Sequence, residues 1–451
     1  MSRIVRSSKF RHVFGTGEKK ENTYDEVKVS ASAWDSNKVA ASNKFVASIW
    51  EAGGGGSFAV IPNSQLGKLP GGYPLVNGHK GAVLDIEFSR FNDNLIASVS
   101  EDGNGRIWSI PEGGLTASLT DPVQTLIGHR RKVGTVNFHP TADNILLTSS
   151  TDFSVKIWDI EKGSVVCDVQ GHSDIIQSTA WNFLGSQVVT SSKDKKIRVL
   201  DPRQNSVAYE GNGHPGVKGS RAIWLGRKEK IFSVGFSKTS DRCFAIHDPR
   251  NIDVPLVKQN VDTSSGILMP FYDDDTGLLF VAGKGDGNIR YFEIEDEKPF
   301  IHYVADYKSA VPQLGMCMRP KTACDTGSCE IVSIIKACKT YLEPIHFTVP
   351  RKSELFQDDI FPPTPGPEPS MTAAQWLGGA NTPPKLVSLE GGFVAKDKSE
   401  FKPTVVVEAV VEKPKTEVEY KSEIEQLNKR IAFLEAELVK RDAKIRELGG
   451  N

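Results

Sequence analysis

The chain of 451 residues has few cysteines, no excess of charge of one sign and no long hydrophobic run. Six cysteines are ordinary for a reducing compartment, where disulfides are rare. The spacing of Cys317, Cys324, Cys329 and Cys338 fits no common zinc pattern, so we expect free thiols there. A formal net charge of −1 excludes a global field that would draw the chain to nucleic acid or to anionic lipid.

Motifs of targeting and of cofactor chemistry are also missing. The opening residues Met1–Arg6 are too charged for a signal peptide, and no apolar run approaches a membrane span. The sequence has no HExxH or C-x-x-C motif, and its Gly53–Gly56 run lacks the Lys-Ser/Thr of a phosphate loop. We therefore expect a cytoplasmic protein without a transmembrane segment, a cofactor or a metal site.

What the sequence does contain is a recurring signature, in which a Gly-His pair is followed by an Asp and, six positions later, by a bulky residue. The copies are Gly78-His79 with Asp102 and Trp108, Gly128-His129 with Asp152 and Trp158, and Gly171-His172 with Asp194 and Leu200. The gap from His to Asp is 23, 23 and 22 residues, and Asp241–His247 and Asp286–Phe292 keep the final gap. Such self-similarity is typical of the blades of a WD-repeat β-propeller.

Each unit predicts a small antiparallel sheet, because apolar and polar residues alternate between turn residues. The Asp falls in the turn between the second and third strands, where it can accept a hydrogen bond from the His. Small hydroxyls precede the Asp by four and two residues: Ser98 and Ser100, Thr148 and Ser150, Thr190 and Ser192, Ser237 and Thr239. One of each pair can complete a buried His–hydroxyl–Asp–Trp network, which is favourable only when all of its polar groups are satisfied.

The same residue types occur in serine hydrolases, and Ser150, His129 and Asp152 could be mistaken for a nucleophile with its base. The trio recurs in unit after unit, whereas an active site has no reason to recur. We therefore interpret these residues as structural and expect no enzyme.

The order of the units predicts an all-β, seven-bladed WD-repeat propeller over residues 1–355. Third strands are expected to end at six bulky residues: Trp50, Trp108, Trp158, Leu200, His247 and Phe292. The stretch from about residue 300 to Pro350 has the length of a seventh blade. The opening segment around Phe10, His12 and Phe14 has no blade of its own, so we expect it to pair into the seventh blade and close the ring.

Beyond Pro350 the composition changes. The run Pro362–Pro367 excludes helix and central strand. Phe356, Phe361, Trp376 and Leu377 are more apolar than a free linker needs, so residues 356–395 are expected to pack on the propeller as an irregular strap, with a linker over 396–419. Within the strap, Thr364-Pro365 and Thr382-Pro383 are candidate sites for proline-directed kinases.

A heptad pattern over residues 420–448 predicts a C-terminal α-helical coiled coil that makes the chain self-associate. Its apolar positions are Ile424, Ile431, Leu438 and Ile445 at one heptad position and Leu427, Leu434 and Leu448 at the other, with Arg441 interrupting. Arg430 and Glu435 stand where they can pair between neighbouring helices, and this pattern favours a parallel trimer. A dimer with a solvated charge pair is the alternative.

Several strings resemble those of the coronins, a family of actin-filament regulators. They are Ser8–Gly15, Gly54–Val60, Ala282–Arg290 and the exit from the propeller, Val349–Ser353 with Phe356–Asp359. The single propeller and the chain length are similar to those of a short coronin. The resemblance implies binding of filamentous actin, crosslinking or bundling through oligomerisation, and a place in the actin cytoskeleton at the cell cortex. It also implies influence on the actin-related-protein complex that nucleates branches, and on cofilin.

Because the surface of actin is acidic, basic loops are the expected contacts: Arg130, Arg131 and Lys132 after one Gly-His pair, and Lys193, Lys195 and Lys196 around Asp194. If each His bonds its Asp, the two loops share a face of the ring. They are otherwise merely solubilising charges. Family members commonly have a basic residue at the position of Ala31, and Lys28 is the candidate substitute. The rival functions are a generic WD-repeat scaffold unrelated to actin and, less favoured, a propeller enzyme.

Overall fold

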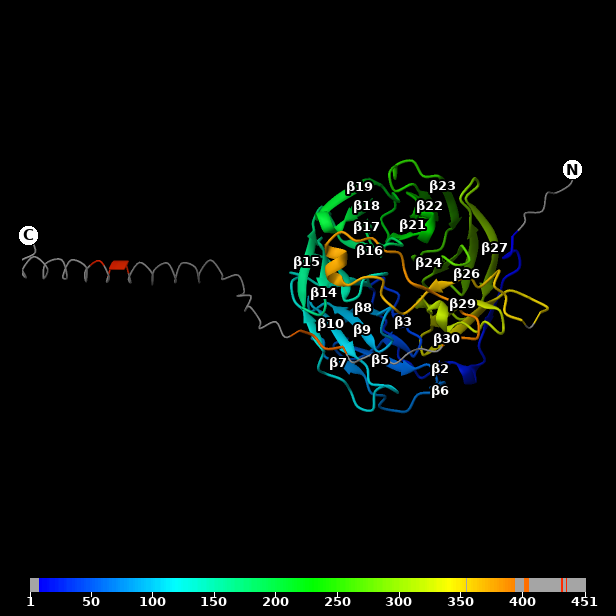
Figure 1. Cartoon of the computed structure of the whole chain (residues 1–451), viewed down its shortest axis with the longest axis horizontal. Helices are drawn as coiled ribbons and strands as arrows, with labels where there is room; N and C mark the ends of the chain where they lie inside the picture. Colours follow the sequence, from blue (N-terminus) through cyan, green and yellow to red (C-terminus); the bar gives the residue numbers. More distant parts are fainter. Residues whose placement is uncertain (1–7, 354, 394–400, 405–430, 433–434, 436–451) are drawn as a thin grey trace, which may run out of the picture. The chain divides into compact units, whose positions relative to one another are not determined.

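The computed structural model describes residues 8–353, 355–393 and 401–404, together with residues 431, 432 and 435. The chain divides into two units, Met1–Thr404 and Val405–Asn451, which we treat separately. In the first unit, seven sheets follow one another around a ring, all antiparallel except for one short parallel pair in the seventh (Figure 1). The predicted seven-bladed, all-β propeller is therefore confirmed.

The first six blades have four strands each. The first contains β3 (Val39–Ala41), β4 (Phe45–Ile49), β5 (Ser57–Pro62) and β7 (Val76–Asn77); the second contains β8 (Val83–Phe88), β9 (Leu95–Ser100), β10 (Gly105–Ser109) and β11 (Gln124–Leu126). The third contains β12 (Val133–Phe138), β13 (Ile145–Ser150), β14 (Val155–Asp159) and β15 (Ser164–Val169); the fourth contains β16 (Ile176–Trp181), β17 (Val188–Ser192), β18 (Lys196–Asp201) and β19 (Ser206–Asn212).

The fifth blade contains β20 (Arg221–Trp224), β21 (Ile231–Phe236), β22 (Arg242–His247) and β23 (Val257–Asp262); the sixth contains β24 (Leu268–Asp273), β25 (Leu278–Gly283), β26 (Asn288–Ile294) and β27 (Ile301–Lys308). Short 3-10 helices are η1 (Lys20–Asn22), η2 (Pro202–Gln204), η3 (Gly226–Lys228) and η4 (Lys321–Ala323). Five of the six predicted third-strand residues lie in third strands, but Trp50 does not. It follows β4, the second strand, because the third strand of this blade begins only at Ser57, after the turn.

The seventh blade combines strands from both ends of the propeller sequence. Its β28 (Gly315–Met318), β29 (Glu330–Ala337) and β30 (Tyr341–Thr348) come from the C-terminal side. From the N-terminal side, β1 (Phe14–Gly17) and β2 (Tyr24–Asp25) both pair antiparallel with β30, and the short β6 (Gly67–Lys68) pairs with β2. We infer that this pairing closes the ring, since it covers an edge of β30 that would otherwise be open.

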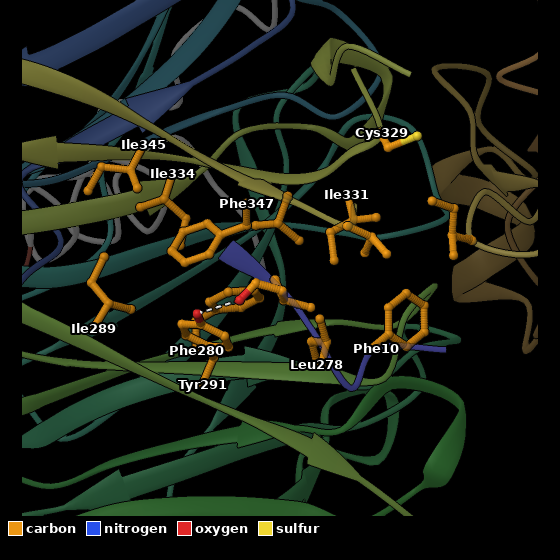
Figure 2. Packing of buried hydrophobic residues seen from close by; sticks show 14 of the residues in the cluster. Phe10, Leu278, Phe280, Ile289, Tyr291, Cys329, Ile331, Ile334, Ile345 and Phe347 are labelled. Atoms are coloured by element: carbon orange, nitrogen blue, oxygen red, sulfur yellow. Dashed lines mark hydrogen bonds between the residues drawn. The ribbon is translucent and has the colours of Figure 1, made fainter. Parts of the chain in front are cut away.

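The N-terminal segment is also anchored by side chains. Phe10 and Val13 lie in a buried cluster with Phe280, Ile331 and Phe347 of the sixth and seventh blades. Figure 2 shows this packing, in which the hydroxyl of Tyr291 donates a hydrogen bond of 2.8 Å to the carbonyl of Val13. Burial of large apolar side chains stabilises such a joint by about 1.5–3 kcal/mol per residue.

Neighbouring blades are joined by side chains at the centre of the ring. First strands of adjacent blades do not pair as a ladder, so some of their amides need acceptors from side chains. Glu87 on β8 accepts a hydrogen bond of 2.9 Å from the amide of Phe138, and Ser178 on β16 accepts one of 2.9 Å from the amide of Ala222. These contacts join the second blade to the third and the fourth to the fifth.

The strap of residues 356–393 packs on the propeller through a short helix, α1 (Ala373–Leu377), and a two-stranded sheet of β31 (Thr364–Pro365) and β32 (Leu386–Val387). Trp376 of α1 is fully buried; its indole donates 2.9 Å to the carbonyl of Gly185, and its ring contacts those of His139 and Trp181. Arg203 donates to the carbonyl of Ala380 at 3.1 Å. The strap is thus an integral part of the first unit.

The ring has two distinct faces. One, here the loop face, carries the turns between second and third strands and the linkers from each blade to the next. The other, here the strap face, carries the remaining connections, including those that hold Gly185 and Arg203. Because α1 binds to Gly185 and Arg203, the strap covers this second face and leaves the loop face free of its contacts.

Candidate functional site

The second and third blades each contain a four-residue network that reaches the loop face. In the second, His79 Nδ1 lies 3.0 Å from Asp102 Oδ2 and its Nε2 lies 2.8 Å from Ser98 Oγ, which also accepts 2.8 Å from the indole of Trp108. In the third, His129, Asp152, Thr148 and Trp158 make the same contacts at 3.0, 2.8 and 2.8 Å. In both, the hydroxyl used is the one four residues before the Asp.

The electrostatics of the network in the second blade favour an ionised Asp102 beside a neutral His79. Burial alone would raise the pKa of Asp102, but the hydrogen bond from His79 and the backbone amides around it lower that pKa to about 2. Burial lowers the pKa of His79. Ser98 and Thr148 are each engaged by both a ring nitrogen and an indole and are buried, so the arrangement offers no free nucleophile.

In the fourth blade, the predicted bond between His172 and Asp194 is absent. His172 Nε2 does contact Thr190 Oγ1 at 2.9 Å, but Nδ1 is buried without a hydrogen-bond partner in the described part of the chain. Asp194 Oδ2 instead accepts from Ser173 Oγ at 3.0 Å and pairs with Arg198 at 2.8 Å. A charged guanidinium binds a carboxylate more strongly than a neutral imidazole does. The carboxylate of Asp194 therefore pairs with the buried Arg198 and not with His172.

The fifth blade has a network that the sequence analysis missed. His214 Nε2 lies 2.9 Å from Ser233 Oγ, which is 2.8 Å from His247 Nε2, and His214 Nδ1 lies 3.2 Å from the thiol of Cys243. Asp241, predicted for this role, instead accepts from Ser237 and Thr239 within its own turn. The sequence feature that indicates this network is a fourth Gly-His pair, Gly213-His214. Its histidine is followed 19 residues later by a serine, as in the second blade.

The sixth blade replaces the network with an ion cluster. Asp286 accepts from the fully buried Arg242 at 2.6 Å, and Arg242 also makes two bonds of 2.6 Å to Asp262. Arg290 donates to the same Asp262 at 2.7 Å. Burial would raise the pKa of Asp262, but Arg242 lowers it to about 2. The six-residue spacing from Asp286 to Phe292 is kept in this blade, although Asp286 is bonded to Arg242 of the fifth blade and not to a histidine.

Replacing Asp152 by Ala is expected to lower the free energy of unfolding by about 1–3 kcal/mol, because His129 Nδ1 and the amide of Arg130 lose their acceptor. Chemical denaturation of both variants measures this loss. Asp241→Ala, at the equivalent turn but without a His partner, is the matched control and should cost clearly less. A fully stable Asp152→Ala variant that had lost a binding or catalytic activity would contradict the structural interpretation.

The predicted basic residues lie on the loop face. Arg130 and Arg131 stand in the linker from β11 to β12, which the bond of 3.0 Å from the amide of Arg130 to Asp152 ties to the β13–β14 turn. Both are exposed, and neither guanidinium has an ion-pair partner among the described residues. Lys132 is different, since its ammonium lies 3.7 Å from Glu101 and 5.5 Å from the ring centre of Trp34.

The second basic group occupies the turn from β17 to β18. Lys193 and Lys195 are exposed, and Lys196 lies 3.6 Å from Glu210. The amide of Lys193 donates 2.9 Å to Ile175, in the linker that enters the fourth blade. Both groups therefore share the loop face by topology, although His172 does not bond Asp194 as the sequence argument assumed.

The N-terminal candidates lie on the same face. Lys28 is exposed, and its carbonyl accepts 2.7 Å from the amide of Glu51 in the β4–β5 turn. Ala31 is also exposed, and its amide donates 2.6 Å to the carboxylate of Glu51. A basic residue at position 31 would therefore lie next to Glu51, whose carboxylate already accepts a hydrogen bond from the amide of residue 31.

Only part of the predicted oligomerisation segment belongs to the described residues. Of the oligomerisation residues, Ile431 and Glu435 are described and lie in helix, and Ile431 is 53% exposed in the single chain. The other predicted heptad residues lie outside the described residues. Within the described part, all six cysteines are free thiols, no cluster of three potential metal ligands occurs, and no helix is long and apolar enough to cross a membrane.

Comparisons with known proteins follow the same architecture. Family models match a domain of unknown function (DUF1899) at residues 3–68, the WD domain, G-beta repeat, at 72–109, 120–159 and 163–201, and a type of WD40 repeat at 342–384. The mitotic checkpoint complex contains a chain with a TM-score of 0.56 and 14% identity, covering 78% of this chain and 98% of that one, which indicates a shared fold alone.

More specific relatives match much more of the sequence. The WD40 domain from Toxoplasma gondii coronin has a TM-score of 0.80 and 32% identity, covering 84% of this chain and 98% of that one. Coronin-2A of Homo sapiens is 46% identical over 86% of this chain and 75% of its own length. Coronin-A of Dictyostelium discoideum is 57% identical over 99% of this chain and 100% of its own length. With this identity sustained from end to end, the chain belongs to the coronin family.

Proposed function

We propose that this protein binds actin filaments through its loop face and is not an enzyme. Membership of the coronin family carries the proposal, and the position of the basic residues supports it. Arg130, Arg131, Lys193 and Lys195 are exposed on the face that the strap leaves free. Because exposed charges attract an acidic partner from a distance, such loops increase both the rate and the specificity of docking.

The finer functions follow from oligomerisation. If residues 420–448 form a coiled coil, each assembly carries several loop faces and can crosslink or bundle filaments. Within the cytoplasm such a protein would organise cortical actin and influence turnover through the branch-nucleating actin-related-protein complex and cofilin. The apolar heptad positions support self-association, and the family supports the actin-related partners.

Charge reversal of Arg130 and Arg131 to Glu should weaken pelleting of the protein with actin filaments by about tenfold or more, because both side chains are exposed and a reversed charge adds repulsion. Binding of the unchanged protein should also weaken as salt rises, since exposed contacts are screened. Lys132 is left in place, because its contacts with Glu101 and Trp34 give it a structural role as well.

A matched double reversal tests whether the face matters. Lys298 and Lys385 are exposed cations of the sixth-blade β26–β27 hairpin and of the strap, on the strap face. Their change to Glu alters the net charge equally and should leave pelleting nearly unchanged. Equal weakening by both pairs would show a nonspecific charge effect, and no pelleting of the unchanged protein at low salt would favour the generic WD-repeat scaffold.

A further inference from the structure

The two Thr-Pro dipeptides of the strap have opposite environments. Thr364 is 2% exposed and pairs through its backbone with Val387 of β32, and its hydroxyl lies beside the carboxylate of Asp275. Thr382 is exposed, and within the described part of the chain its hydroxyl has no hydrogen-bond partner. The two dipeptides are identical in sequence, but only the threonine of the second is accessible to solvent.

Hydrogen bonds on both sides of Thr382 hold the segment against the rest of the first unit. Arg203 donates 2.8 Å to the side-chain oxygen of Asn381, and Ser370 donates 2.7 Å to the carbonyl of Pro383. The carbonyl of Lys385 accepts 2.8 Å from the amide of Gly366. Residues 377–386 form a continuous accessible stretch, since eight of these ten residues are exposed and none is buried. The segment is thus presented at the surface in a defined position.

The local chemistry suits an enzyme that recognises a short extended motif. Thr382 is followed directly by Pro383, and Lys385 stands three positions after the threonine. The Lys385 side chain is 55% exposed and its nearest carboxylate partner, Glu368, is 3.9 Å away and 58% exposed. A surface pair of this kind is weak, so the ammonium can be captured by an acidic group of the enzyme.

We propose that Thr382 is a phosphorylation site for a proline-directed, ATP-dependent protein kinase, and that the fold excludes Thr364 from the same reaction. The Thr382 oxygen attacks the γ-phosphorus of magnesium-bound ATP, and an oxygen–phosphorus bond forms. The bond from that phosphorus to the β–γ bridging oxygen breaks, ADP leaves, and the hydroxyl proton passes to the carboxylate base of the kinase. The product is a phosphate monoester on the strap face.

Electrostatics reinforces the exclusion of Thr364. Its hydroxyl lies beside Asp275, which follows Asp273 and Asp274 in the sequence, and the side chain of Asp275 is 5% exposed. A phosphate carries a charge of about −1.5 to −2 and would lose its hydration at this buried position, beside carboxylates that already share their cations, Arg227 and Lys321. Modification of Thr364 therefore requires the strap to open and then opposes its closure.

The experiment uses the full-length protein, a purified proline-directed kinase and magnesium ATP, with peptide mass mapping over time. We expect one phosphate per chain, at Thr382, and phosphorylation of Thr364 slower by about tenfold or more, because it waits for local opening. Thr382→Ala should abolish incorporation, Thr364→Ala should leave it unchanged, and Lys385→Ala should slow it severalfold.

Two short peptides, residues 359–370 and 377–388, provide the unfolded reference. If the kinase modifies both peptides but only Thr382 in the protein, the fold makes the selection, as proposed. Comparable modification of Thr364 in the folded protein, or unchanged incorporation in Thr382→Ala, would overturn the proposal. Refusal of the 359–370 peptide would also overturn the exclusion, because local sequence would then suffice. Filament pelleting is not the readout, so this test is independent of the proposed actin binding.

Discussion

A chain that ends at residue 419 is expected to lose filament crosslinking entirely and to bind filaments with an apparent affinity about 10²-fold lower or more. Joined binding sites increase apparent affinity without any new contact, and the heptads that would join them lie in residues 420–448. The first unit should remain folded, because the last described contacts of the propeller are made by Phe401 and Thr404. Light scattering should give a monomer, and low-speed pelleting should detect no bundles.

A second variant separates oligomer number from oligomerisation. Arg430→Ala combined with Glu435→Ala in the full chain should remain associated through its apolar heptad positions but lose its preference for three strands. Analytical ultracentrifugation distinguishes the states. A dimeric mass for the unchanged protein would contradict the trimer, whereas crosslinking by the truncated chain would require a second filament site within the propeller.

Replacing Arg242 by Ala is expected to lower the free energy of unfolding by about 3–5 kcal/mol, because it leaves the carboxylates of Asp262 and Asp286 without their shared buried partner. The thermal midpoint should fall by many degrees. Arg290→Ala is the matched control, since this arginine is 22% exposed and, within the described residues, forms its ion pair with Asp262 and not with Asp286. Its loss should cost much less. Equal stability of Arg242→Ala and the unchanged protein would contradict a stabilising cluster.

The pH dependence gives an independent signature of the same cluster. In the unchanged protein the folded pKa of Asp262 is lowered to about 2, so its stabilising contribution is complete above the ordinary Asp value of about 4 and is lost as pH falls through 2. Without Arg242 the charged form of Asp262 is disfavoured in the fold, and its folded pKa should rise. The stability gap between variant and unchanged protein should therefore narrow below about pH 4.

Spacing along the chain was sufficient to predict the blades, because each unit is built from contacts within one repeat. The turn between second and third strands brings Asp152 to His129 with no help from the rest of the chain, and the same gap recurs at His79 and Asp102. The same reasoning failed at His172, because Arg198, only four residues after Asp194 along the chain, pairs with the carboxylate that the spacing assigned to the histidine. It also overlooked His214, which has the expected hydroxyl partner, Ser233, but has Cys243 in place of the Asp, while His247 takes the place of the Trp.

The sequence by itself determined the propeller, its blade number and the basic character of one linker and one turn. These features depend on residues that are close together in the chain. Only the tertiary structure decided which face remains free, because Trp376 and Gly185 are 191 residues apart and their contact places the strap. It likewise decided that Arg242 donates a hydrogen bond to Asp286 in the next blade, and that Thr382 is exposed while Thr364 is buried. Such contacts join segments by shape and charge, and no local spacing encodes them.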